Sequence, residues 1–204
     1  MVKVVFFGTP PFAVPSLERL VAGGEQVAAA VTQPDRRRGR GQRLQPSAVK
    51  SAALAHGIPV LQPARASDPA FLAHLSVLQP DLGVVAAYGK MLPDSVLHTP
   101  RLGTINVHAS LLPKYRGAAP VHRAIMAGER ETGITMIRLV RQMDAGPMLA
   151  RVVHPIGEDD TSEMAERALA ALGADLLLST VAAIASGQAV EEEQDHARAT
   201  LAPR

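Results

Sequence analysis

The sequence predicts an α/β fold, with a doubly wound, mostly parallel sheet that is flanked by helices. Three observations predict it. The chain opens on an almost unbroken apolar run at residues 2–7, which is typical of a central strand covered on both faces. Further apolar runs alternate with helical patterns of about ten residues, as in βαβ units. Hydrophobic residues make up 47% of the 204 residues, which is enough for a sizeable buried core.

Each element has a local signal. Strands are predicted at residues 2–7, 26–32, 60–61, 82–87, 104–107, 134–140 and 148–153. Helices are predicted at residues 12–22, 46–57, 68–78 and 162–185. Pro11 suits a first helical turn, Gly23 and Gly24 suit a helix end, and Asp68 followed by Pro69 suits an N-cap and first position. This order of elements is Rossmann-like.

Composition limits the chemistry and the setting. The chain has no cysteine, which excludes disulfides, thiolate zinc sites and cysteine nucleophiles and suits a reducing compartment. The first apolar run is too short for a signal peptide. We expect no apolar stretch near the roughly 18 residues that a membrane span needs. A cytoplasmic protein without a membrane partner is therefore expected.

The charge is concentrated in one segment. Residues 33–50 hold six basic residues against one aspartate, a local charge of +5, which leaves −3 for the rest of a chain whose net charge is +2. Such asymmetry indicates either a localised anionic partner or a solvated basic loop. Gly39 and Gly41 favour a mobile loop here.

Several common sites are disfavoured. The first strand is followed by Gly8-Thr9-Pro10-Pro11, and these prolines replace amides that would face a pyrophosphate, so a dinucleotide-dependent oxidoreductase is disfavoured. No phosphate-binding loop motif and no G-x-S-x-G elbow is found in the sequence. The seven histidines form no zinc-like pair, so we expect no metal.

A polar pair stands at the end of one predicted strand. Asn106 and His108 are two residues apart and therefore point to the same face. An amide donor beside an imidazole suits a reaction that develops an oxyanion and moves a proton. Asp144, in a predicted turn, could hydrogen-bond the imidazole and fix its tautomer. Taken singly, such residues are more often a structural or exposed histidine, a turn or capping asparagine and a turn aspartate.

Longer motifs resemble those of the folate-dependent formyltransferases. The main one is INVHASLLPKYRGAAP at residues 105–120; ETGIT at 131–135, MDAG at 143–146, GTP at 8–10 and VAAYG at 85–89 fit in the same order. The resemblance implies 10-formyltetrahydrofolate as formyl donor, with Asn106, His108 and Asp144 as catalytic residues. It also implies a folate pocket lined by Tyr88, Gly89, Ser110, Leu111, Leu112 and Pro113.

The basic segment and residues 117–120 look most like the tRNA-acting members of that family. That branch implies methionyl-initiator tRNA as acceptor and phosphate contacts from Arg36, Arg37, Arg38, Arg40 and Arg43. It also implies a catalytic domain at residues 1–189 and, at residues 190–204, the start of a linker to an OB-like domain absent from this chain. We expect a monomer. The alternatives are a formyltransferase for an amino-sugar nucleotide or other small amine, and a non-catalytic RNA-binding module.

Overall fold

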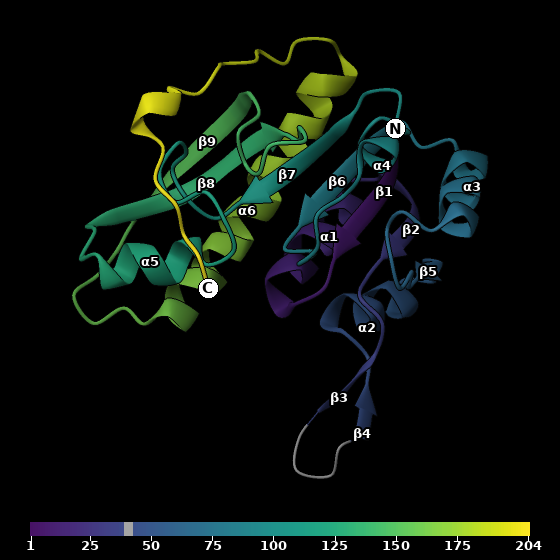
Figure 1. The fold of residues 1–204 in the computed structure, drawn as a ribbon, viewed down its shortest axis with the longest axis horizontal. Coiled ribbons are helices and arrows are strands. Elements are labelled where there is room, and N and C mark those ends of the chain that lie inside the picture. Colours follow the sequence, from purple (N-terminus) through teal and green to yellow (C-terminus); the bar gives the residue numbers. More distant parts are fainter. Residues whose placement is uncertain (39–42) are drawn as a thin grey trace.

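A seven-stranded sheet forms the centre of the computed structural model, which describes residues 1–38 and 43–204 (Figure 1). Its strand order is β5-β2-β1-β6-β7-β8-β9. The first five strands of this order run parallel, β8 pairs antiparallel with β7, and β9 pairs antiparallel with β8. The strands are β1 Lys3–Gly8, β2 Gln26–Val31, β5 Val60–Leu61, β6 Leu82–Ala86, β7 Thr104–His108, β8 Glu131–Arg138 and β9 Met148–Pro155. The predicted fold class is confirmed.

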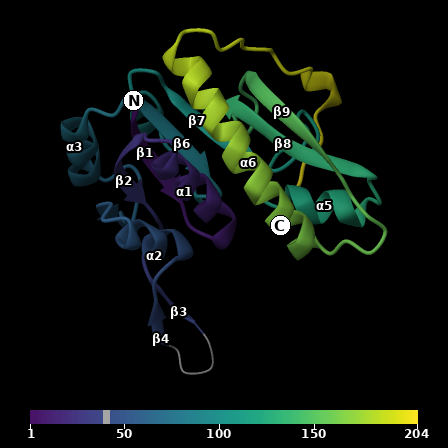
Figure 2. The same cartoon turned by 180° about the vertical axis from the view of Figure 1, so that it is seen from behind.

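Helices cover both faces of the sheet. They are α1 Val14–Ala22, α2 Ala48–Ala55, α3 Pro69–Leu78, α4 Asp94–Leu97, α5 Pro120–Met126 and α6 Ser162–Ala185, with short 3-10 turns η1 Pro11–Ala13 and η2 His196–Arg198. Seen from behind, α1 and α6 lie in front of the sheet (Figure 2). The Asp68 side chain accepts a hydrogen bond from the Ala70 amide at 3.0 Å, which confirms the predicted cap of α3. The sequence prediction missed α4 and α5, which are only four and seven residues long.

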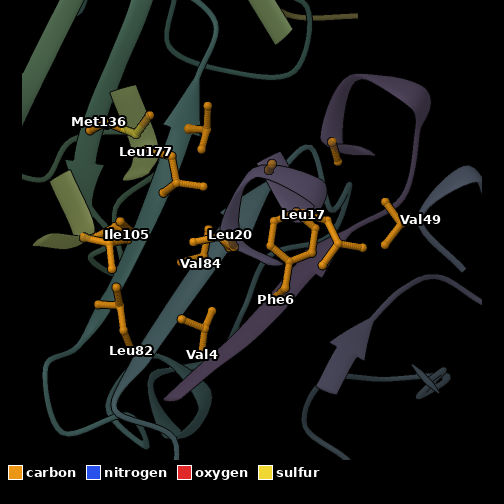
Figure 3. Packing of buried hydrophobic residues seen from close by; sticks show 14 of the residues in the cluster. Val4, Phe6, Leu17, Leu20, Val49, Leu82, Val84, Ile105, Met136 and Leu177 are labelled. Atoms are coloured by element: carbon orange, nitrogen blue, oxygen red, sulfur yellow. The ribbon is translucent and has the colours of Figure 1, made fainter. Parts of the chain in front are cut away.

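Alternation along β1 divides the core into two. Val4 and Phe6 point to the face covered by α1, where Leu17 and Leu20 meet them (Figure 3). Val5 and Phe7 point to the opposite face, into a smaller cluster with residues of α3 and α4. Because β1 is buried on both faces, its apolar run is unbroken, as the sequence predicted.

The flanks of the basic segment are strands. They are β3 Arg36–Arg38 and β4 Arg43–Gln45, an antiparallel pair that extends away from the sheet (Figure 1). We call this pair the β3–β4 arm. The backbones of these flanks satisfy each other across the ladder. The mobile loop expected at Gly39 and Gly41 falls outside the described residues. Residues 39–42, including Arg40, lie outside the described residues.

Helix α6 corrects a second expectation. By length and composition alone it could cross a membrane, since an 18-residue window within it has a mean hydropathy of 1.9. Core helices of globular proteins pass the same test. In this chain 44% of the window is buried, and α6 packs against α1, β8 and β9.

Residues 190–204, here called the C-terminal segment, run past β9 and along the loop after β7 (Figure 1, yellow). Met148 and Glu192 exchange two backbone hydrogen bonds of 2.8 Å. Arg116 donates from its amide to the Thr200 carbonyl at 2.8 Å and accepts from the Ala202 amide at 2.7 Å. The sequence prediction of a linker start did not foresee these contacts. Whether the segment also leads into a further domain stays a prediction.

Candidate active site

The end of β7 brings the predicted polar pair to Asp144. Asn106 and His108 lie on the same face of the strand, as expected from its alternation. Asn106 donates from Nδ2 to Oδ1 of Asp144 at 3.4 Å. Nδ1 of His108 lies 3.7 Å from Oδ2 of Asp144, with side chains only 5% and 11% exposed. The structure thus assembles the three residues that the sequence could not place together.

Asp144 is held from two directions. It lies in the connection between β8 and β9, with a left-handed backbone (φ 49°) that aspartate tolerates better than most residues. The Gly117 amide donates to its Oδ2 at 2.9 Å. The side-chain amide of Gln194 donates to its carbonyl oxygen, also at 2.9 Å. The carboxylate therefore has a fixed orientation towards β7.

The imidazole of His108 is also oriented. Nε2 lies 3.0 Å from the Tyr115 carbonyl oxygen. A carbonyl only accepts, so Nε2 carries the hydrogen in this contact. The 3.7 Å from Nδ1 to Asp144 exceeds hydrogen-bond range, so a hydrogen on Nδ1 can also reach a ligand oxygen.

The loop that supplies the Tyr115 carbonyl is anchored through Glu129. Both Lys114 Nζ and the Tyr115 hydroxyl donate to Oε1 of Glu129, at 2.9 and 2.8 Å. The Lys114 bond, followed by the Tyr115 bond, lowers the pKa of Glu129. Burial and the Glu129 carboxylate raise the pKa of Tyr115 to about 12. The hydroxyl therefore remains a donor at neutral pH, and the loop stays attached to its support.

An open cavity of about 1300 Å³ adjoins the three residues. Its lining includes the apolar side chains of Leu92, Leu97 and Leu139. It also includes residues 9–12, Gln33, Arg36 and residues 117–123. Asn106, His108 and Asp144 lie among its lining residues. The volume exceeds that of most small-molecule sites, so two reactants could meet at the cluster.

Known proteins match this fold and sequence closely. The family model for formyl transferases matches residues 2–181. The chain belongs to the formyl transferase family. It is 48% identical over 202 residues to the methionyl-tRNA formyltransferase of Methylococcus capsulatus, covering 99% of this chain and 66% of that protein. The chain thus spans just under two thirds of that relative's length.

Solved structures of other formyl transferases share the fold. Glycinamide ribonucleotide transformylase 1 from Symbiobacterium toebii superposes with a TM-score of 0.79 at 20% identity, covering 96% of this chain and 95% of that one. An N-formyltransferase from Helicobacter canadensis, solved with folinic acid and dTDP-3-aminofucose, has a TM-score of 0.76 at 20% identity. That match covers 100% of this chain and 71% of the other. At these identities the likeness concerns the fold alone.

In this chain, two of the predicted folate contacts line the cavity. They are Tyr88 and Gly89. The Tyr88 ring is 2% exposed and packs edge-on against Phe7, and burial raises its pKa. Its carbonyl oxygen accepts hydrogen bonds from Thr9 Oγ1 and Gln33 Nε2, both at 3.0 Å. The Tyr88–Gly89 backbone is thereby fixed beside the cavity.

The other four predicted folate contacts, residues 110–113, are not among the described residues that line the cavity. They contact other parts of the protein instead. Ser110 donates from Oγ to the Lys114 carbonyl at 2.7 Å. The Leu112 amide donates to Thr135 Oγ1 at 3.1 Å, and its side chain packs on Ile137 and Met148. Leu111 and Pro113 belong to the same turn, in which the Leu111 side chain lies against Gly133. Contact of residues 110–113 with folate stays a prediction.

The predicted tRNA-contacting arginines differ in how far the structure describes them. Arg36 donates to Oε1 of Gln33 at 2.8 Å and lines the cavity, and Arg37 is exposed. The backbones of Arg38 and Arg43 pair across the arm. The sequence reasoning missed Gly117, Gln33 and Gln194, because a backbone amide and single glutamines carry no recognisable pattern.

Proposed function

We propose that the chain transfers a formyl group from 10-formyltetrahydrofolate to the amino group of methionyl-initiator tRNA. The observation that carries the proposal is the Asn106–His108–Asp144 cluster beside an open cavity. The name of the relative from Methylococcus capsulatus supports this acceptor.

The folate donor suits the apolar residues of the cavity lining. Leu92, Leu97 and Leu139 offer a surface on which a flat pteridine can pack, beside the fixed backbone of Tyr88 and Gly89. The Helicobacter canadensis protein, which shares the fold, was solved with folinic acid, a folate derivative. We also keep Ser110, Leu111, Leu112 and Pro113 as proposed folate contacts.

The chemistry follows from the donors at the cluster. The acceptor amine attacks the formyl carbon, a new C–N bond forms, and the formyl oxygen becomes negatively charged. The second Nδ2 hydrogen of Asn106 and a hydrogen on Nδ1 of protonated His108 can stabilise that oxygen. Donors of this kind are worth about 2.7–4 kcal/mol each. No covalent bond to the protein is needed.

Proton transfer completes the step. The attacking amine must lose a proton, and the folate nitrogen must gain one as its bond to the formyl carbon breaks. Asp144 is suited to accept the first, directly or through water, and His108 to deliver the second. A proton then passes from Asp144 back to His108, which restores both groups. The bond made and the bond broken balance, with the net transfer of one proton from amine to folate.

The arm suits a tRNA acceptor. Arg36 and Arg37 are exposed on β3, and Arg36 also lines the cavity next to Gln33. Guanidinium groups pair well with phosphates, and such contacts fix the register of a nucleic acid on a protein. We propose that Arg38, Arg40 and Arg43 contribute to the same contact.

We further propose that residues 1–189 are the catalytic domain and that residues 190–204 begin a linker to an OB-like domain. The matched family range, 2–181, supports the first boundary. We expect a monomer that acts in the cytoplasm, without a membrane partner or a metal.

One experiment tests the function. The protein is incubated with 10-formyltetrahydrofolate and, separately, with methionyl-initiator tRNA, free methionine or an amino-sugar nucleotide. We expect formylation of the tRNA-bound methionine alone. Transfer to the sugar nucleotide would support the rival acceptor. Binding of tRNA without any folate-dependent transfer would indicate an RNA-binding module instead.

A further inference from the structure

Gln194, in the C-terminal segment, is a buried amide with four polar partners. It is 4% exposed. Its Nε2 donates to the carbonyl oxygens of Asp144 and Gly146, at 2.9 and 2.7 Å. Its Oε1 accepts from Nε and Nη2 of Arg116, at 3.1 and 2.6 Å. Both hydrogens and both lone pairs of the amide are therefore used, which only glutamine or asparagine chemistry allows.

These bonds join the two loops that hold the catalytic cluster. On one side, Gln194 fixes the Asp144 turn by its backbone. On the other, Arg116 lies between Tyr115, whose carbonyl orients His108, and Gly117, whose amide holds the Asp144 carboxylate. A single side chain thus connects the supports of both the imidazole and the carboxylate.

Other contacts of the C-terminal segment reinforce this connection. His196 Nδ1 lies 3.0 Å from Nη2 of Arg116. Thr200 Oγ1 accepts from the Tyr115 amide at 2.8 Å. Gly117 (φ 126°) packs so closely that a Cβ there would meet the Ala202 carbonyl oxygen at 2.9 Å. The C-terminal segment therefore packs closely against the loop after β7.

We propose that Gln194 is a positioning residue for formyl transfer, which sets Asp144 against His108 and Asn106 through the backbone of the Asp144 turn. The inference rests on the proposed function. Asp144 is sensitive to such positioning, because its contacts with Asn106 and His108 are long, at 3.4 and 3.7 Å. A displacement of about 1 Å can cost a reaction on the order of 100-fold in rate.

The primary test replaces the amide by a side chain of similar shape. In Gln194→Met the donors to Asp144 and Gly146 are removed, and we expect kcat to fall by about 10- to 100-fold while KM for both substrates changes less than about twofold. Gln188→Met is the matched control, since Gln188 is exposed and lies just after α6. It should leave both constants unchanged. A kcat of Gln194→Met within about twofold of wild type would overturn the proposal.

Two further variants separate positioning from general damage. Gln194→Glu keeps an acceptor for Arg116 but places a carboxylate oxygen against two carbonyls, so we expect it to lose as much kcat as Gln194→Met. In an Asp144→Ala background, Gln194→Met should cost no further activity, because its effect passes through Asp144. An equal loss in that background, or full activity of Gln194→Glu, would contradict the role.

A readout without turnover keeps this test independent of the proposed function. The Gly117 amide is protected from hydrogen exchange by Oδ2 of Asp144. Gln194→Met should raise its exchange rate by at least about tenfold relative to Gln188→Met, as local opening becomes easier. Unchanged exchange would refute the positioning role even in an active enzyme. Absence of formyl transfer by the wild type, with exchange raised in the variant, would refute the proposed function alone.

Discussion

Asp144 adopts a left-handed backbone that would be strained for most side chains. That conformation turns its carboxylate under β7, where it meets Asn106 and His108. The Gly117 amide and the Gln194 side chain hold it there. These contacts fix a left-handed conformation that aspartate adopts more readily than most residues.

The first prediction concerns these three side chains. Asn106→Ala, His108→Ala and Asp144→Ala should each lower kcat by at least about 100-fold, because each removes a donor or proton carrier from the transition state. Steady-state formylation of methionyl-initiator tRNA measures this, with circular dichroism to check the fold. His74→Ala, at an exposed position of α3, is the matched control. Near-normal turnover of His108→Ala would exclude the assigned role.

The sequence predicted these residues unequally. Strand alternation alone placed Asn106 and His108 on one face. The catalytic role of Asp144 was implied by the family resemblance, because 38 residues separate it from Asn106 and no local pattern spans that distance. Gln194 was not predicted, because its function depends on two backbone carbonyls that any sequence would supply.

Among the elements, the β3–β4 arm has an unusually well-fixed base. Lys50 Nζ donates to Oδ2 of Asp35 at 2.6 Å, and Gln62 Nε2 donates to its Oδ1 at 2.7 Å and to the Gln33 carbonyl at 2.9 Å. The Lys50 bond and then the Gln62 bond lower the pKa of Asp35. The base of the arm is therefore tied to α2 and to the loop after β5.

A second prediction concerns the arm. Replacing Arg36 and Arg37 with serine should raise KM for tRNA and reduce the slope of log KM against log salt by up to about 0.7–0.9 for each phosphate that the arm no longer neutralises. The matched control replaces Arg19 and Arg101, which also removes two charges but from positions paired with Asp175 and Asp81. An unchanged slope in the arm variant would argue against tRNA binding there.

Long elements were predictable and short ones were not. Helix α6 was expected at residues 162–185, the same range as in the structure, because seven turns make a clear period. Helix α4, with four residues, has too few positions to show one. The strands of the arm were not predicted, because they consist mainly of polar residues and show no alternation of apolar and polar positions.

At the scale of the whole molecule, α6 joins the two parts of the sheet. It packs on β8 and β9 of the antiparallel edge and on α1, which covers the parallel part. Gly173 lets α6 also approach β7 closely, because a Cβ there would lie 3.0 Å from Cγ1 of Val107 in that strand. We therefore expect the chain to unfold as one cooperative unit.

A third prediction measures that connection. Leu169→Ala, in the fully buried face of α6, should lower the free energy of unfolding by about 2–5 kcal/mol through reduced burial and a residual cavity. Leu54→Ala is the same change in α2, where the side chain is 60% exposed, and should stay within about 0.5 kcal/mol. Urea unfolding measures both. Equal effects would show that α6 is not part of the shared core.

The contact between the C-terminal segment and the loop after β7 joins residues 78 positions apart, from Arg116 to Gln194. A ribosome delivers the chain from its N-terminus, and the sheet and α6 are all encoded before residue 190. The sheet and α6 can therefore form before Gln194 is available to hold the Asp144 turn. Catalytic competence would therefore appear only after this scaffold has formed.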